Sequence, residues 1–380
     1  MKNVLVILLI TLVTFKGFAQ IDQRVITTGV PFMLIAGDAR SAGMGDIGVA
    51  SAPDAFSQQW NPAKFAFSKD KQGIGVTYTP YLQKLVNDIY LANVTYYNRL
   101  NERSAVAGSL RYFTNGVIEL RDTPDQEPLE VKPNELLFDL SYSLRLSERF
   151  SMAVAGRYIR SDLKLQTAIE DARAANTFAV DIAGYYQSEE IPYDSFDGRW
   201  RAGFNFSNIG PKLKYDETGQ ENNLPTNMAL GGGFDFILDP YNKVSALVEV
   251  NKLLVPTPSD SNGDDSIGRE DDYYNQTFVQ GIFSSFGDAP DGFSEELKEF
   301  TWALGAEYTY QDSFAFRAGY FNESDEKGSR KFATLGAGFK YTSINIDLSY
   351  LFSTSQVISP LEGTLRFGLT FNFGEQYDEY

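Results

Sequence analysis

The chain has 380 residues, of which 33 are basic and 50 acidic, and its formal net charge is −17. This acidic balance argues against nucleic acid as a partner, because phosphates need a basic surface. The sequence contains no His and no Cys, which excludes a Ser-His-Asp triad, a Cys nucleophile, disulfides and an ordinary zinc site. We therefore expect no catalytic residues, no cofactor and no metal.

Residues 1–19 form a predicted signal peptide. Lys2 gives a positive start, a largely apolar run of twelve residues follows (VLVILLITLVTF), and Gly17 and Ala19 are small residues placed for cleavage. The run is short for a spanning helix, and an uncleaved anchor is the alternative. Cleavage removes Lys2 and Lys16, so the mature chain has 31 basic and 50 acidic residues and a formal charge of −19.

The segment SAGMGDIGVA, residues 41–50, contains Gly43, Gly45 and Gly48 with the spacing of the dinucleotide-binding motif G-x-G-x-x-G. That motif binds a pyrophosphate only between a buried strand and the start of a helix. Here the preceding residues are too polar for a buried strand, and Pro53 cuts short any helix that begins at Gly48. We therefore interpret the glycines as structural, in a tightly packed segment where Cβ atoms would clash.

Beyond the signal peptide no stretch has eighteen consecutive apolar residues, and the recurring pattern is alternation with a period of two. In GTLRFGLTFNF, residues 363–373, large apolar side chains alternate with small or polar ones, so a strand there has one apolar and one polar face. ELLFDLSYSLRL at 135–146 and EFTWALGAEYTY at 299–310 repeat the pattern. Comparable segments begin near residues 72, 87, 104, 150, 176, 199, 227, 242, 312, 330 and 344, which makes fourteen in all.

Such strands fit either a soluble sandwich or a barrel in lipid, and three features favour the barrel. The segments run for about ten to twelve residues, which crosses a membrane at a tilt. Aromatic residues gather near segment ends, where interfacial girdles lie. An even strand number closes without an open edge, as lipid requires. We therefore predict an all-β fold, a 14-stranded antiparallel transmembrane β-barrel in the outer membrane. The girdle candidates are Tyr96, Tyr97, Tyr112, Phe113, Tyr308, Tyr310, Tyr341, Tyr350 and Phe352.

The links between these segments alternate in length, as expected for periplasmic turns and extracellular loops. The link at 188–198 breaks this alternation, because it is long at a position where a short turn is expected. The short links are 147–149, 239–242, 311–313 and 342–343, and the long ones are 115–134, 163–175, 208–226, 254–298 and 354–362.

Charged side chains on the predicted inner face suggest a transport path, a carboxylate pair, or a solvated, mutually paired lining of the lumen, and we favour the lining. The inner-face apolar residues Leu91, Leu137, Ile159 and Leu247 are scattered, which gives little support to an apolar pocket. The charged residues are Arg111, Asp139, Arg145, Arg157, Asp181, Arg199, Arg201, Asp235, Glu249, Glu307, Arg317, Lys340 and Arg366.

The long link at 254–298 carries ten acids against two basic residues. DSNGDDSIGRED, residues 260–271, approaches a calcium loop but has Asp265 in place of Gly and Asp271 in place of Glu. Its second half mixes apolar side chains with acids, which indicates a docking surface, a lid over the barrel mouth, or both. The candidate partner-binding residues are Phe278, Ile282, Phe283, Phe286 and Phe293.

The segment GDARSAGMGDIGVASAPDAFSQQWNPAKFAF, residues 37–67, resembles the N-terminal hatch of FadL-like barrels, and Asn61, Pro62 and Ala63 match their Asn-Pro-Ala signature. More closely, GDARSAGMGD with WNPA is similar to the opening of the PorV family, also called LptO, and GIFSSFGDAPDGFSEELKEF at 281–300 resembles that family too. The residues that we assign to a structural plug are Gly43, Gly45, Gly48, Trp60, Asn61 and Pro62.

This resemblance implies a FadL-like barrel that is a non-enzymatic outer-membrane component of the type IX secretion system of Bacteroidetes. The implied partners are the main translocon barrel (SprA, also called Sov), cargo C-terminal domains, the attachment complex with the sortase PorU, and outer-membrane lipid. The name LptO would imply lipid A deacylation, which a chain without His supports poorly. The alternative function is a FadL-like channel for hydrophobic small molecules. The expected domains are a signal peptide at 1–19, a hatch or plug at 20–70, a barrel at 71–374 with the loop 254–298, and a C-terminal tail at 375–380.

Overall fold

The structure is a computed structural model. It describes residues 24–377 apart from 122, 124, 164–172, 218, 262, 264–266, 268–270 and 356–357. The predicted signal peptide and its cleavage site therefore lie outside the described residues. None of the helices in the described part is long and apolar enough to cross a membrane.

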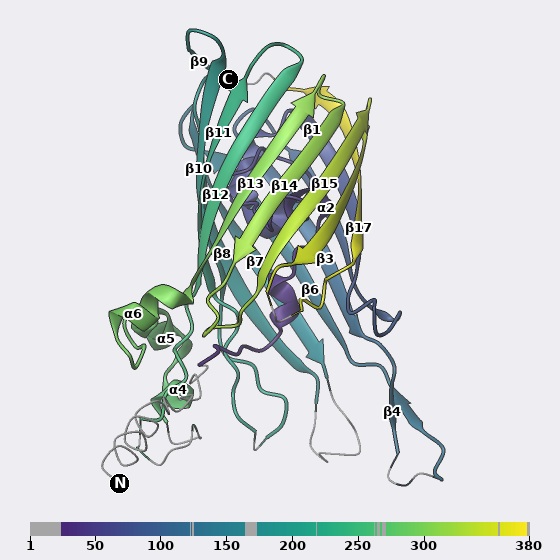
Figure 1. The fold of residues 1–380 in the computed structure, drawn as a ribbon, viewed down its shortest axis with the longest axis vertical. Coiled ribbons are helices and arrows are strands. Elements are labelled where there is room, and N and C mark those ends of the chain that lie inside the picture. The colour runs from purple at the N-terminus through teal and green to yellow at the C-terminus, as the bar shows by residue number, and fades with distance from the viewer. Residues whose placement is uncertain are drawn as a thin grey trace, which may run out of the picture.

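The described strands build a closed antiparallel barrel (Figure 1). Its sheet has 15 strands, and the two-residue β9 (Ile191–Pro192) only extends the edge of β10, which leaves fourteen in the wall. β1 pairs with β17, with Gly75 opposite Thr370, and so closes the wall. The predicted fold class is confirmed. The wall strands are β1 (Asp70–Pro80), β2 (Ile89–Arg99), β3 (Ser104–Asn115), β6 (Asn134–Arg145), β7 (Phe150–Asp162), β8 (Ala175–Gln187), β10 (Asp197–Ile209), β11 (Asn227–Ile237), β12 (Asn242–Leu253), β13 (Phe300–Tyr310), β14 (Phe314–Asn322), β15 (Lys331–Tyr341), β16 (Ile344–Ser353) and β17 (Leu365–Gln376).

Side chains alternate between the two faces of the wall, as the period of two predicts. In β17, Phe367 is exposed on the outer face while Arg366 is buried on the inner one. The prediction is wrong for two of the girdle aromatics, because Tyr97 and Phe113 are buried inside the lumen. Each directly follows an outward-facing aromatic residue, and neighbours along a strand cannot share a face.

Long and short links lie at opposite ends of the barrel, which we call the long-loop end and the turn end (Figure 1). The longer link of residues 188–196 lies at the turn end. There, Tyr193 stacks on Phe196 at 4.9 Å and meets Phe234 of β11 edge-on at 6.1 Å. Aromatic packing of this link against the strand ends explains its extra length. At the long-loop end, β4 (Ile118–Leu120) pairs with β5 (Leu129–Val131) in a hairpin of its own.

The N-terminal residues fill the lumen, and we call residues 24–69 the plug (Figure 1). The plug starts at the long-loop end, where Tyr273 Oη donates to the carbonyl of Thr27. It reaches the turn end at Ser68, whose carbonyl accepts a hydrogen bond from Arg99 of β2. The plug helices are η1 (Pro31–Leu34), α2 (Ala39–Ala42), α3 (Ser57–Trp60) and η2 (Pro62–Phe67), and the link between β12 and β13 contains α4 (Asp272–Asn275), α5 (Phe278–Ser284), α6 (Phe293–Glu296) and η3 (Leu297–Glu299).

The domain bounds stay predictions, and the strands place the wall between Asp70 and Gln376. Glu375 and Gln376 therefore belong to β17 and not to a tail.

Candidate functional site

The three glycines of residues 41–50 allow close approach between the plug and the wall. Gly45 has φ +78°, a conformation that favours glycine, and a Cβ there would lie 3.0 Å from the backbone nitrogen of Tyr320. A Cβ on Gly43 would lie 3.0 Å from the Cα of Gly336 in β15. A Cβ on Gly48 would lie 2.1 Å from Cγ of Trp60. Packing therefore accounts for all three glycines.

The backbone groups at Gly48 bind an anion, but that anion belongs to the protein. The N–H groups of Gly48 and Val49 both donate to Oε2 of Glu249 in β12, at 2.9 Å. Consecutive N–H groups of this kind are the ones that would contact a pyrophosphate in a dinucleotide site. The wall carboxylate takes that place, so the dinucleotide interpretation is excluded by the geometry.

Trp60, Asn61 and Pro62 fix the end of the plug. Trp60 Nε1 donates to Oδ2 of Asp38 at 2.6 Å. Asn61 Nδ2 donates to the carbonyls of Val49 and Gly184, each at 2.9 Å, and so joins the plug to β8. Pro62 begins η2, where its missing N–H costs no hydrogen bond.

Ion pairs hold the plug against the wall. Arg40 of α2 binds Glu307 of β13 through two nitrogens, at 2.8 and 3.0 Å, and Asp54 of the plug at 2.9 Å. Arg317 of β14 binds Glu307 on its other side at 2.6 Å. Farther round the lumen, Arg366 pairs with Asp46 at 3.2 Å. Bidentate contacts of this kind fix geometry as well as charge.

Many of the wall charges form ion pairs, as predicted, but most of the set is buried and not solvated. Arg201 pairs with Asp235 at 2.6 Å, and Arg157 pairs with Asp181, in both cases with both partners buried. Asp139 accepts a hydrogen bond from Gln58 of the plug at 2.9 Å. The expectation of a water-filled lining is therefore wrong, because the plug displaces water from the wall. Among the charged residues of the predicted inner face, Lys340 is the exception, because it is half-buried.

The apolar residues of the inner face are not scattered. Leu91, Leu137 and Ile159 gather in one buried cluster with Phe32 and Met33 of the plug, whereas Leu247 lies in another cluster. The sequence expectation is wrong here because three separate strands bring these residues to one height of the wall. Phe32 and Met33 fill the space between them, so the plug occupies the apolar side of the lumen.

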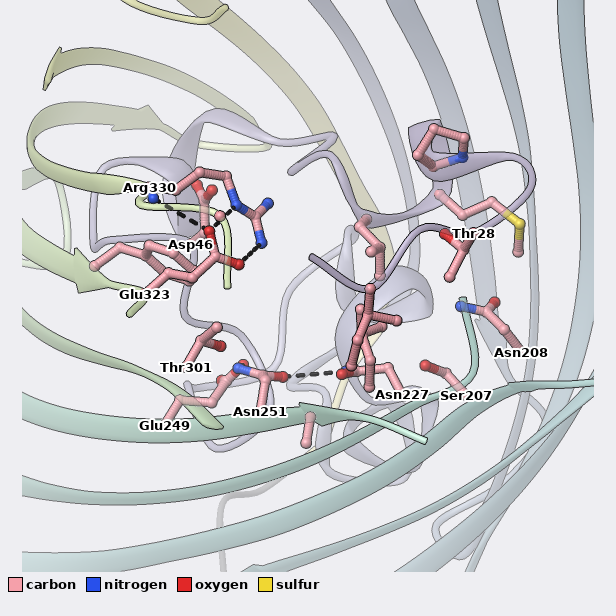
Figure 2. A pocket seen from close by; sticks show the side chains of 18 of the residues that line it. Thr28, Asp46, Ser207, Asn208, Asn227, Glu249, Asn251, Thr301, Glu323 and Arg330 are labelled. Carbon is pink, nitrogen blue, oxygen red and sulfur yellow. Dashed lines mark hydrogen bonds and ion pairs between the residues drawn. The ribbon is translucent and has the colours of Figure 1, made fainter. Parts of the chain in front are cut away.

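A cavity of about 520 Å³ lies between the plug and the wall of β10–β15, towards the long-loop end (Figure 2). The lining combines Thr28 and Met33 of the plug with side-chain amides such as Asn227 and Asn251. A second cavity of about 220 Å³ lies towards the turn end, beside Arg40 and Lys69. The plug separates the two cavities.

The link between β12 and β13, residues 254–299, is anchored by buried ion pairs. Lys252 of β12 binds Glu296 at 2.7 Å and Glu299 at 2.6 Å. Lys327, from the link between β14 and β15, binds Glu295 at 2.7 Å. Burial acts to raise the pKa of Glu295, but the Lys327 ammonium outweighs it and holds that pKa below its usual range. The base of the loop is thus fixed before any partner binds.

Three of the five candidate partner-binding residues protrude from this loop. Phe283 is 74% exposed, Phe286 49% and Phe293 77%. Phe278 and Ile282 are half-buried, at the first and fifth positions of α5, whose start Thr277 caps in a capping box with Gln280. In Figure 1 the helices α4–α6 lie to one side of the barrel end. The high exposure of Phe283, Phe286 and Phe293 does not fit aromatic residues packed over the mouth as a lid.

Several of the loop's acidic residues that the structure describes take part in contacts that hold the loop in place. Asp288, Glu296 and Glu299 have oxygens within 4.8 Å of one another, a spacing that could hold a metal ion. Lys252 lies between the two glutamates and supplies the positive charge. Burial raises the pKa of Asp288. Much of the calcium-like stretch 260–271 lies outside the described residues.

Comparison with known proteins gives the family. The family model for the type IX secretion system protein PorV matches residues 18–260, more than half of the chain. The chain belongs to the PorV family. It is therefore an outer-membrane component of the type IX secretion system. The match ends at residue 260, so the likeness of the 281–300 loop to PorV stays a prediction.

The chain is similar to solved structures of outer-membrane transporters. The toluene transporter TodX of Pseudomonas putida is 10% identical, with 90% of this chain and 100% of TodX covered and a TM-score of 0.50. The toluene transporter TbuX of Ralstonia pickettii is 10% identical over 90% and 100% of the two chains, with a TM-score of 0.49. A FadL homologue of Pseudomonas aeruginosa is 13% identical over 93% and 100%, with a TM-score of 0.44. At such identity TodX shows the barrel fold alone. No curated protein sequence matches.

Sequence reasoning missed the residues that join distant segments. No sequence pattern indicates Arg40, which joins the plug to β13. The amides of the larger cavity were also missed. Their signal was present in part, because Asn205, Asn227 and Asn251 lie near the ends of predicted strands. Nothing in the sequence places those strand ends side by side facing one cavity.

Proposed function

We propose that this PorV-family protein binds the main translocon barrel of the type IX system (SprA, also called Sov) and receives cargo by its C-terminal domain. On this proposal it passes cargo to the attachment machinery that includes the sortase PorU, acts without enzymatic chemistry, and carries its long loops on the extracellular side. The supporting observation is the loop 254–299, which combines a base fixed by buried ion pairs with three protruding phenylalanines. Exposed aromatic side chains on an ordered support are typical of binding hot spots.

The filled lumen supports an adaptor over a conduit. Ion pairs from Arg40 and Asp46 and an apolar cluster around Phe32 bind the plug to several sides of the wall. A barrel that is occupied in this way presents its loops and its outer face to partners. The FadL-like channel stays a prediction, and fatty-acid uptake by a deletion strain tests it. Uptake equal to that of the parent strain is expected, and a loss of uptake would favour the channel.

To test the loop, Phe283, Phe286 and Phe293 are all changed to Ser in one triple variant, which is expressed in the secreting bacterium. We expect cargo to be lost from the cell surface and the medium while the protein stays at its normal level in the outer membrane, since each hot-spot aromatic is worth about 2 kcal/mol or more of binding. Leu129→Ser is the matched control, because Leu129 is 45% exposed on the separate β4–β5 hairpin. Normal cargo secretion by the triple variant at a normal protein level would overturn the proposal.

A further inference from the structure

The larger cavity has a row of hydrogen-bonding side chains on its wall. Asn205 of β10 lies opposite Ala229 of β11, Ala229 opposite Asn251 of β12, and Asn251 opposite Thr301 of β13. All four residues line the cavity. The small side chain of Ala229 leaves room in front of the wall between the two amides. Three of four neighbouring strands, β10, β12 and β13, thus offer an amide or hydroxyl group in one row across the wall.

One of these amides, Asn205, is only partly satisfied by the protein, whereas Asn251 accepts from Asn227 and its Nδ2 donates to Oε1 of Glu249 at 3.3 Å. Asn205 is 3% exposed, and its Nδ2 donates to the carbonyl of Trp60 at 2.8 Å. Its Oδ1 is buried and accepts no hydrogen bond from the described residues. Asn227 Nδ2 donates to Oδ1 of Asn251 at 3.1 Å, a contact drawn in Figure 2. A buried amide oxygen without a donor costs about 1–3 kcal/mol, so the cavity favours a molecule that donates hydrogen bonds.

The charges that line the cavity are already paired within the protein. Arg330 binds Glu323 at 2.8 Å, as Figure 2 shows. Lys327 binds Glu295 and Glu299 of the loop. Glu249 accepts the two plug N–H groups, and Asp46 pairs with Arg366. A charged ligand would have to break these pairs, so a neutral ligand fits this cavity better.

The lining also has apolar and aromatic side chains beside further polar ones such as Thr28, Gln59 and Asn208. Met33, Leu34 and Trp60 come from the plug, and Phe321 and Phe332 come from β14 and β15. A hydrocarbon would bury the amide row without partners, which costs free energy at each unpaired group. A peptide added as a strand needs a free sheet edge, which the closed wall does not offer.

We propose that this cavity binds a short neutral oligosaccharide. Sugar hydroxyls both donate and accept, which suits amides and hydroxyls, and the C–H faces of sugar rings suit aromatic and aliphatic side chains. A volume of about 520 Å³ falls in the range of ligand sites. This inference does not rest on the proposed adaptor role, because it uses no residue of the aromatic loop surface.

Maltotriose and triacetylchitotriose are the probes, added to the intact protein in a sugar-free detergent. Trp60 lines the cavity, whereas Trp200 and Trp302 lie on the outer face, so tryptophan fluorescence of a Trp200→Phe, Trp302→Phe background reports on the site. We expect saturable binding of at least one sugar. Asn251→Leu weakens it by about tenfold, the effect of one or two lost hydrogen bonds. The matched control Asn134→Leu, on β6 outside the cavity, leaves it unchanged.

The outcomes are distinguishable. If Asn251→Leu does not fold, Thr301→Val removes one hydroxyl from the same row with little change in shape, and weaker sugar binding by that variant supports the proposal. No saturable binding of either sugar to the folded protein means a cavity that holds water only, and it overturns the proposal. Equal binding by the cavity variants and Asn134→Leu also overturns it, as does toluene binding that strengthens in Asn251→Leu.

Discussion

Single residues in the plug are fixed by contacts that leave no spare volume. At Gly48 an added Cβ would lie 2.1 Å from Trp60, whose indole is itself held by Asp38. We expect Gly48→Ala to destabilise the folded barrel by about 1–3 kcal/mol, the usual cost of overpacking. Gly156→Ala is the matched control, since a Cβ on Gly156 of β7 would meet nothing within 4 Å. Urea unfolding in detergent, followed by tryptophan fluorescence, measures both variants. Equal stability would contradict tight packing at Gly48.

Sequence reasoning explains part of this residue-scale picture. The spacing of Gly43, Gly45 and Gly48 and the nearby Pro53 were enough to reject a phosphate loop and to predict close packing. These sequence features could not identify the residues that the three glycines contact. Trp60 lies twelve residues from Gly48 in the sequence. Glu249, which accepts a hydrogen bond from the N–H of Gly48, lies 201 residues from it. Such contacts depend on how the plug enters the barrel, which no local pattern encodes.

At the scale of elements, the plug is held to the wall by buried charges. Arg40→Met removes the partner that Glu307 and Asp54 share. Because Glu307 keeps its pair with Arg317, we expect a cost at the lower end of the about 3–5 kcal/mol typical of removing one member of a buried pair. We expect this variant to release the plug to added protease while the wall stays folded. Arg149→Met is the control, because the Arg149–Glu189 pair is exposed to solvent and contributes little to stability. Protease resistance equal to that of Arg149→Met would show that Arg40 does not hold the plug.

The strands were predictable for a physical reason that the plug lacks. Lipid on one side of the wall and a crowded lumen on the other impose a period of two on each strand over ten or more residues. The segment predicted to begin at residue 135, for example, is β6, which begins at Asn134. The plug helices are as short as Ala39–Ala42, too short to show a helical period. They form because caps such as Asp38 and contacts with the wall select them. The girdle prediction was wrong at adjacent aromatics such as Tyr96 and Tyr97. Neighbouring residues of a strand face opposite sides, so only one of the two can face lipid.

At the scale of the whole molecule, the plug contacts almost the full circumference of the wall. η2 contacts β2, β3, β6, β7 and β8, and α2 contacts β15, β16 and β17. Met44 and Ile47 pack with Leu247 and Ala303 of β12 and β13, and Ala50 lies against Gly231 of β11. The two cavities lie on either side of this layer. A barrel of this kind combines a fixed interior with exposed loops, as the proposed adaptor role requires.

This arrangement predicts how the protein behaves in a planar lipid bilayer. The intact protein should show no large conductance steps, because the plug fills the lumen at mid-height and its ion pairs hold it there. Deletion of residues 24–66 leaves the wall strands intact and should produce large steps, since barrels of similar or greater strand number without a plug leave an aqueous channel. Heat-modifiable migration on gels verifies that the shortened barrel is folded before it is measured. Large, stable steps from the intact protein would mean that the plug leaves the lumen readily, and the channel alternative would then regain support. Silence from both proteins would mean that inward side chains of the wall close the lumen by themselves, and the plug would then serve to support the loops and not to seal the barrel.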